Sequence, residues 1–206
     1  MSAREIDTPQ GPARAIVAPA PSARGALVLG HGAGGGVQAP DLIAAANAAT
    51  AVGFTVVRVE QPYRVAGRRA PAPARQLDTA WLAVLECLRA DELAGLPCVV
   101  GGRSSGGRVA CRTAAAAGAI GVLCLAFPLQ PPGRPGAPSR LPELEAVRVP
   151  VLVVQGDRDP FGVPPEAPGR RVVRVAGDHG LKRDLGAVTA AVAAWLREVS
   201  DAVDGA

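Results

Sequence analysis

The chain has 206 residues, of which 49% are hydrophobic and only 3% aromatic, which favours one domain with an aliphatic core. Its net charge of +4 comes from scattered arginines without aromatic interleaving, which argues against nucleic-acid binding. No apolar run approaches the roughly 20 residues of a membrane span, and the first residues lack the apolar stretch of a signal peptide. Because the four cysteines form no C-x-x-C pair, we expect reduced thiols and a cytoplasmic protein.

Residues 1–12 are polar and contain proline and glycine, which predicts a loose N-terminal segment. Residues 13–206 alternate strand and helix patterns, which predicts a single α/β domain. The predicted strands cover residues 13–18, 25–29, 54–59, 98–100, 120–127, 149–154 and 171–176, and the predicted helices cover 41–51, 74–90, 105–117 and 184–203. Because the strands are apolar throughout, we expect a mostly parallel sheet of about six to seven strands flanked by helices. The proline-rich loop at 128–142 leaves no room for a cap domain.

The segment Gly102-Arg103-Ser104-Ser105-Gly106 lies between a predicted strand and a predicted helix. A strand that ends in G-x-S-x-G and turns directly into a helix is the nucleophile elbow of α/β-hydrolases. Only very small residues fit two positions either side of the nucleophile, and two glycines satisfy this around Ser104. In the frame shifted to Ser105 the upstream position is Arg103, which is too large. Ser104 is therefore the predicted nucleophile.

A base and an acid follow Ser104 in the order that this fold requires, which is serine, acid, histidine. His179 follows the last predicted strand, whereas His31, the other histidine, precedes the serine. The loop after the strand at 149–154 holds Asp157 and Asp159. We favour Asp159 because its spacing from the preceding glycine carries it past the strand end. The sequence predicts a triad in which His179 activates Ser104 and Asp159 orients His179.

The oxyanion of an acyl-transfer intermediate needs hydrogen-bond donors that are placed in advance. We expect them to be the amide of Ser105 and an amide of the glycine-rich loop after the strand at 25–29, most simply that of Ala33. His31 begins this loop, and we interpret it mainly as a structural residue, with substrate contact as the alternative. Neither role requires a metal or a cofactor.

Arginines near the predicted mouth give one hint about the substrate. Arg64 lies in the loop at 61–73 and Arg103 lies in the elbow, so both are candidate ligands for an anionic substrate. The alternatives are a solvated loop, or pairing with Asp41 or Glu60.

Three motifs together carry a family resemblance: Gly30-His31-Gly32-Ala33-Gly34, the stretch from Gly101 to Arg108, and the stretch from Gln155 to Gly162. With them the chain resembles small dienelactone-hydrolase-like α/β-hydrolases over residues 13–200. It especially resembles the bacterial relatives of an animal testis-expressed protein and of a subunit of an animal acetyltransferase complex. The resemblance implies the α/β-hydrolase fold and a serine-hydrolase site, without naming a substrate. Because this subgroup includes scaffolds, a non-catalytic interaction module remains an alternative.

A remote alternative is a dinucleotide-binding protein, since Gly30-x-Gly32-x-x-Gly35 follows a strand and Glu60 ends the next one. Pro40 delays the helix, however, and the hypothesis leaves the triad residues unexplained. We therefore expect a cytoplasmic serine hydrolase that forms an acyl-enzyme with a small ester, thioester or lactone. We predict a small-molecule substrate and no nucleic-acid or membrane partner, and the sequence leaves the oligomeric state open.

Overall fold

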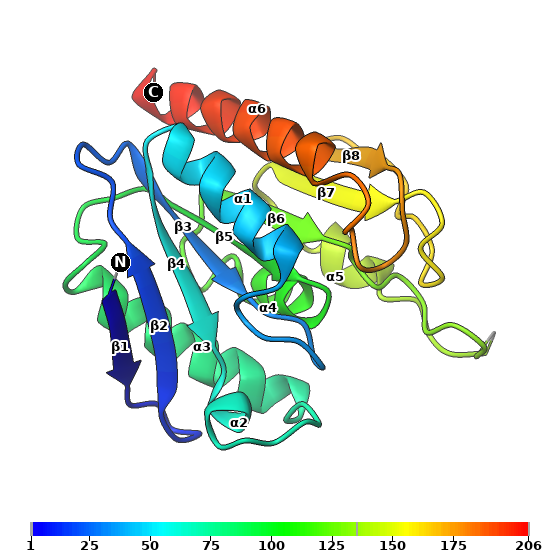
Figure 1. Cartoon of the computed structure of the whole chain (residues 1–206), viewed down its shortest axis with the longest axis horizontal. Helices are drawn as coiled ribbons and strands as arrows, with labels where there is room; N and C mark the ends of the chain where they lie inside the picture. The colour runs from blue at the N-terminus through cyan, green and yellow to red at the C-terminus, as the bar shows by residue number, and fades with distance from the viewer. Residues whose placement is uncertain (1, 135, 206) are drawn as a thin grey trace.

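The protein folds around one eight-stranded sheet, described here from a computed structural model that covers residues 2–134 and 136–205 (Figure 1). The strand order is β1-β2-β4-β3-β5-β6-β7-β8. The strands are β1 Ser2–Ile6, β2 Ala13–Ala18, β3 Gly25–Gly30, β4 Phe54–Glu60, β5 Cys98–Arg103, β6 Gly121–Leu125, β7 Val151–Gly156 and β8 Arg170–Val175. The pairs from β4 to β8 are parallel, whereas β1 and β2 are antiparallel to their neighbours.

Helices cover both faces of the sheet (Figure 1). They are α1 Pro40–Ala51, α2 Pro62–Val65, α3 Ala74–Arg89, α4 Ser105–Thr113, α5 Leu141–Glu145 and α6 Leu185–Asp204. Leu42 of α1 and Trp195 of α6 belong to the apolar core on one face, while Trp81 of α3 and Val109 of α4 belong to the core on the other. Within the described residues, no helix combines the length and the apolar character needed to cross a bilayer.

The mostly parallel sheet with helices on both faces confirms the predicted fold class. The prediction of a loose segment at residues 1–12 is wrong, because β1 pairs with β2 from Ser2 opposite Val17 to Ile6 opposite Ala13. This edge strand also raises the strand count to eight. Its one buried residue is Ile6, so it carries no apolar pattern by which the sequence could reveal it.

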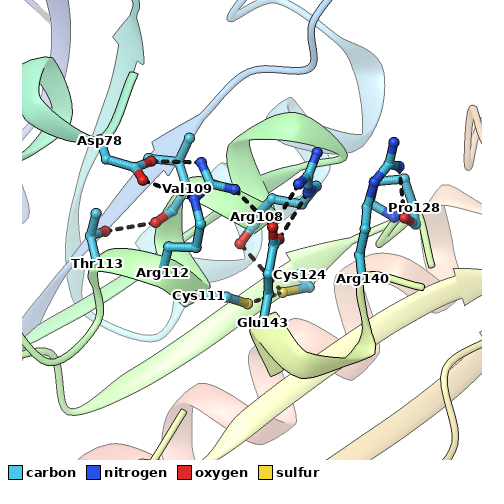
Figure 2. Close-up of polar contacts among 11 residues, drawn as sticks. Asp78, Arg108, Val109, Cys111, Arg112, Thr113, Cys124, Pro128, Arg140 and Glu143 are labelled. Atoms are coloured by element: carbon cyan, nitrogen blue, oxygen red, sulfur yellow. Dashed lines mark hydrogen bonds and ion pairs between the residues drawn. The ribbon is translucent and has the colours of Figure 1, made fainter. Parts of the chain in front are cut away.

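Between β6 and β7 the described residues form a loop and the short helix α5, with no cap domain. A network of ion pairs fixes α5 against the helix that follows the elbow (Figure 2). Glu143 of α5 accepts hydrogen bonds from Arg108 at 2.8 and 2.6 Å, and from Arg112 at 3.3 Å. Arg112 in turn donates to Asp78 of α3 at 2.8 and 2.6 Å. The network therefore joins α3, α4 and α5 into one layer beside the loop after β6.

The parallel strands bring their carboxyl ends to one edge of the sheet. His31 follows β3, Ser104 follows β5, Asp159 follows β7 and His179 follows β8. Residues from four distant parts of the sequence therefore meet along this edge, which is the usual location of ligand sites in such sheets.

Candidate active site

Ser104 lies in the sharp turn between β5 and α4 with a φ of 50° and a ψ of −109°. A positive φ is unusual for a residue with a side chain and costs on the order of 1–3 kcal/mol. A Cβ atom on either Gly102 or Gly106 would collide with the carbonyl oxygen of Gly30. The neighbouring strand β3 therefore excludes any larger residue at these two positions, and the turn presents the Ser104 side chain at the edge of the sheet.

The structure brings the three predicted catalytic side chains together in one chain of hydrogen bonds. Nδ1 of His179 lies 2.8 Å from Oδ2 of Asp159, and Nε2 of His179 lies 2.9 Å from Oγ of Ser104. Since a carboxylate only accepts, Nδ1 carries the proton and Nε2 accepts from the serine hydroxyl. This tautomer is the one in which Nε2 can take the serine proton.

The side chain of Asp159 has no solvent exposure, and its carboxylate accepts three hydrogen bonds. Its Oδ2 accepts from Nδ1 of His179 and, at 2.7 Å, from Nε2 of Gln155, while its Oδ1 accepts from the amide of Phe161 at 2.9 Å. Asp157, the alternative acid, is exposed and accepts instead from the amide of Gly177. Of the two candidates, the structure places Asp159 beside the histidine.

Phe161 covers one side of the histidine. Its ring centroid lies 4.3 Å from that of His179, with 36° between the ring planes. Phe161 also lines a hollow of about 290 Å³ together with residues 129–134 of the proline-rich loop. The ring of Phe161 is therefore an apolar surface next to the imidazole.

The peptide between Gly32 and Ala33 is held in a defined orientation. The Gly32 carbonyl accepts from Nδ1 of His31 at 2.8 Å and from the Gly35 amide at 3.1 Å. In a trans peptide the carbonyl and the N–H point in opposite directions, so these bonds also orient the Ala33 N–H. A Cβ atom on Gly32 would lie 3.7 Å from Cβ of Ser104, which shows that the loop borders Ser104.

Both ring nitrogens of His31 are occupied by backbone groups. The amide of Gln61 donates to Nε2 at 3.1 Å, which leaves the proton on Nδ1 for the Gly32 carbonyl. Burial lowers the pKa of His31, and the neutral ring is the form that this geometry needs. These contacts are those expected for the structural interpretation of His31, and its contact with a substrate stays a prediction. The Ser105 amide is the first of α4 and has no partner within the helix.

The two candidate arginines have different surroundings. Nε of Arg103 forms an ion pair of 2.9 Å with the buried Asp41, and Nη2 donates to the carbonyl of His179 at 2.9 Å. Pairing with Asp41, the alternative to substrate binding, is therefore what the structure shows for Arg103. Arg64 lies on α2 and donates to the carbonyl of Arg68 at 3.3 Å. Its role as a substrate ligand stays a prediction.

The geometry opposes the dinucleotide-binding hypothesis. The helix α1 begins at Pro40, well after Gly35, and its first turn holds the carboxylate of Asp41. A pyrophosphate needs free amides and a positive helix end, whereas a buried carboxylate there would repel it.

Gln155 and Phe161 had no role of their own in the sequence analysis. One signal for Gln155 was present, because it is the only polar side chain in the otherwise apolar strand β7. A polar residue that is fully buried needs a partner, and the loop that follows Gln155 holds both Asp157 and Asp159. Nothing in the sequence showed that Phe161 would stack on the histidine ring.

Comparisons with known proteins agree with the fold. A family model described as an alpha/beta hydrolase domain matches residues 23–185, and no curated protein matches the sequence. A structure from Xanthomonas campestris, described as a serine hydrolase without a lid, is 25% identical and has a TM-score of 0.74, covering 96% of this chain and 94% of that one. Est1E from Butyrivibrio proteoclasticus is 18% identical, with a TM-score of 0.78 and coverage of 97% and 99%. A dienelactone hydrolase from Anabaena variabilis is 16% identical, with a TM-score of 0.73 and coverage of 96% of each chain. At these identities the last two bear on the fold alone.

Proposed function

This chain belongs to the alpha/beta hydrolase domain family, and we propose that it is a serine hydrolase that cleaves a small carboxylic ester, thioester or lactone. The observation that carries the proposal is the unbroken hydrogen-bonded chain from Oγ of Ser104 through His179 to Asp159. A serine hydroxyl is a poor nucleophile until a base takes its proton, and this arrangement supplies the base and holds it in the required tautomer.

In the proposed reaction, Oγ of Ser104 attacks the acyl carbon while Nε2 of His179 takes the hydroxyl proton. The amides of Ala33 and Ser105 donate to the negative oxygen of the tetrahedral intermediate. When the bond to the leaving group breaks, His179 returns the proton to that group and an acyl-serine remains. A water molecule, deprotonated by the same nitrogen, then attacks the acyl carbon, and the serine regains its proton. The buried Asp159 keeps its hydrogen bond to Nδ1 of His179 and stabilises the imidazolium in both halves.

Two further features support a small substrate. The described residues form no cap between β6 and β7. The similar Xanthomonas campestris protein is likewise described as a serine hydrolase without a lid. We therefore propose that short acyl groups suffice to occupy the site. An anionic substrate group would lie toward Arg64, whose helix α2 contacts the glycine-rich loop through the Tyr63 hydroxyl and the Ala33 carbonyl, 2.9 Å apart.

Labelling with a fluorophosphonate probe, which reacts with activated serines, tests the proposal. We expect the wild-type chain to be labelled, Ser104→Ala to lose labelling and Ser105→Ala to retain it. The two variants are matched, because each removes one hydroxyl from the same turn. If the folded wild-type chain is not labelled, or if Ser104→Ala is labelled at the wild-type rate, the proposal is wrong. Absence of labelling in a folded chain would favour the non-catalytic interaction module.

We also propose that the protein acts in the cytoplasm. Its four cysteines are free thiols, and the sulfur atoms of Cys111 and Cys124 lie 3.5 Å apart without a bond between them (Figure 2). An oxidising compartment would favour joining so close a pair. Fractionation of cells that produce a tagged chain tests this location.

A further inference from the structure

The guanidinium of Arg103 lies where three segments of the site converge. It ion-pairs with Asp41 in the first turn of α1 and donates to the carbonyl of His179, with 2.9 Å in each case. A Cβ atom on Gly32 would lie 2.8 Å from its Nη1, so the glycine-rich loop passes directly against the same group. The residue itself directly precedes Ser104. From within the elbow, the Arg103 side chain therefore contacts the segment that carries His179. It also lies against the glycine-rich loop that carries the predicted oxyanion amide.

The segment that carries His179 has little regular structure of its own. Gly177 has a φ of 139° and Leu181 a φ of 49°, and the segment lies between the end of β8 and the start of α6. Among the described residues, Arg103 is the only group that donates a hydrogen bond to the His179 carbonyl. The ring of His179 must keep both Ser104 and Asp159 within hydrogen-bond distance. A tether on its main chain limits the movements that would break these contacts.

Asp41 determines where the guanidinium points. Its side chain has no solvent exposure, whereas that of Arg103 is 18% exposed. Because a buried carboxylate needs a positive partner, Asp41 holds the Nε edge of the guanidinium on the side of α1. The Nη2 group then faces the His179 carbonyl. A lysine carries the same charge but only one nitrogen, so it cannot hold a carboxylate and a separate carbonyl with a planar fork.

We propose that Arg103, oriented by Asp41, is a positioning residue that ties the His179 segment to the nucleophile elbow. This inference rests on the proposed serine-hydrolase function and adds a residue to its machinery. Arg103 touches none of the reacting atoms and acts through the backbone of His179.

The test compares Arg103→Lys with Arg108→Lys. Arg108 is a matched control, because it also pairs with a carboxylate and its side chain is 27% exposed, but that side chain does not contact the triad. With p-nitrophenyl butyrate we expect Arg103→Lys to lower kcat by about tenfold or more, with KM unchanged within about threefold. We expect Arg108→Lys to keep both constants within about twofold. A fall in kcat without a change in KM separates misplacement of the base from loss of substrate binding.

A second measurement does not depend on turnover. The chain has only two histidines, so a sample with ¹⁵N-labelled histidine gives two sets of ring signals, assigned with a His179→Gln variant. We expect the Nδ1 proton of His179, bonded to Asp159, to exchange faster with water in Arg103→Lys. The signals of His31 should stay unchanged, and Arg108→Lys should leave both sets unchanged.

If Arg103→Lys fails to fold, the double variant Asp41→Asn with Arg103→Met replaces it, because it removes both buried charges together. The proposal is overturned if the folded variant keeps the wild-type kcat and the wild-type His179 signals. It is also overturned if Arg108→Lys loses as much kcat as Arg103→Lys. If the wild-type chain shows no fluorophosphonate labelling, the proposed function is wrong, and the ring signals alone then decide whether Arg103 positions His179.

Discussion

Replacement of Gln155 by leucine tests whether a buried amide holds the triad acid. Gln155 is fully buried at the end of β7, with Nε2 2.7 Å from Oδ2 of Asp159 and 3.1 and 2.9 Å from the carbonyls of Phe127 and Gly162. Gln155→Leu removes this donor at similar volume. A hydrogen bond to a charged group contributes about 1.5–3 kcal/mol, and the carbonyls lose their partner as well. We expect the free energy of unfolding to fall by about 2–4 kcal/mol.

The same change should slow the reaction, because Oδ2 of Asp159 is also the acceptor for Nδ1 of His179. With one of its three donors gone, the carboxylate holds the imidazole less firmly. We expect kcat to fall about 10- to 100-fold, which corresponds to about 1.4–2.8 kcal/mol in the activation barrier. KM should change little, because Gln155 is buried away from any substrate. Steady-state kinetics with p-nitrophenyl butyrate, well below the melting temperature of the variant, measures both constants.

A double-mutant cycle shows whether Gln155 acts through Asp159. If it does, Asp159→Asn and Asp159→Asn with Gln155→Leu should have the same residual kcat, since the second change has nothing left to disturb. Two outcomes would refute the reasoning. One is a folded Gln155→Leu variant with kcat within about twofold of the wild type. The other is a pair of effects that multiply in the double variant, which would show that the two residues act independently.

Two more predictions concern pH and substrate length. Burial lowers the pKa of His31. Below about pH 6.5, the histidine therefore binds fewer protons in the native chain than in the unfolded chain. The free energy of unfolding should consequently decrease as the pH falls through this range. Melting temperatures between about pH 5 and 8 should therefore fall more steeply for the wild type than for His31→Asn, and parallel curves would contradict this. No cap encloses the site in the described residues, and a further CH₂ contributes about 0.8 kcal/mol only if it is buried. We therefore expect kcat/KM for p-nitrophenyl esters to fall when the acyl chain is longer than about C4–C6. A steady rise to long chains would reveal a buried channel.

The parts of the molecule that the sequence predicts are those fixed by local rules. Apolar strands that alternate with helices leave few arrangements other than a parallel sheet covered on both faces. The spacing of Gly102 and Gly106 around Ser104 follows from backbone contacts with β3, which exclude any Cβ atom there. By contrast, β1 is held by its pairing with β2 and by ion pairs from Arg4 to Asp91 and Glu92, which are remote in sequence. No local pattern encodes such contacts.

The partners of the candidate site residues could not be predicted in the same way. The sequence leaves open whether Arg103 meets a substrate or Asp41, because both outcomes need only a cation at that position. The choice depends on where the first turn of α1 lies relative to β5, which is set by the packing of α1 on the sheet. Likewise, Gln155 can be seen as an anomaly in an apolar strand, but its contact with Asp159 depends on the path of the loop after β7.

The buried polar groups near the triad are better explained by positioning than by stability. Replacing a buried ion pair with apolar side chains is often neutral or stabilising, so the pair of Asp41 and Arg103 is a weak source of stability. Burial raises the pKa of Asp41, which means that the fold disfavours the negative charge with which Asp41 pairs with Arg103. The core on the face of the sheet that α1 covers consists mostly of valine, leucine and alanine, which form stable packing without an ion pair. What apolar residues could not supply is a fixed donor to the His179 carbonyl, and this is the contact that joins the base to the elbow.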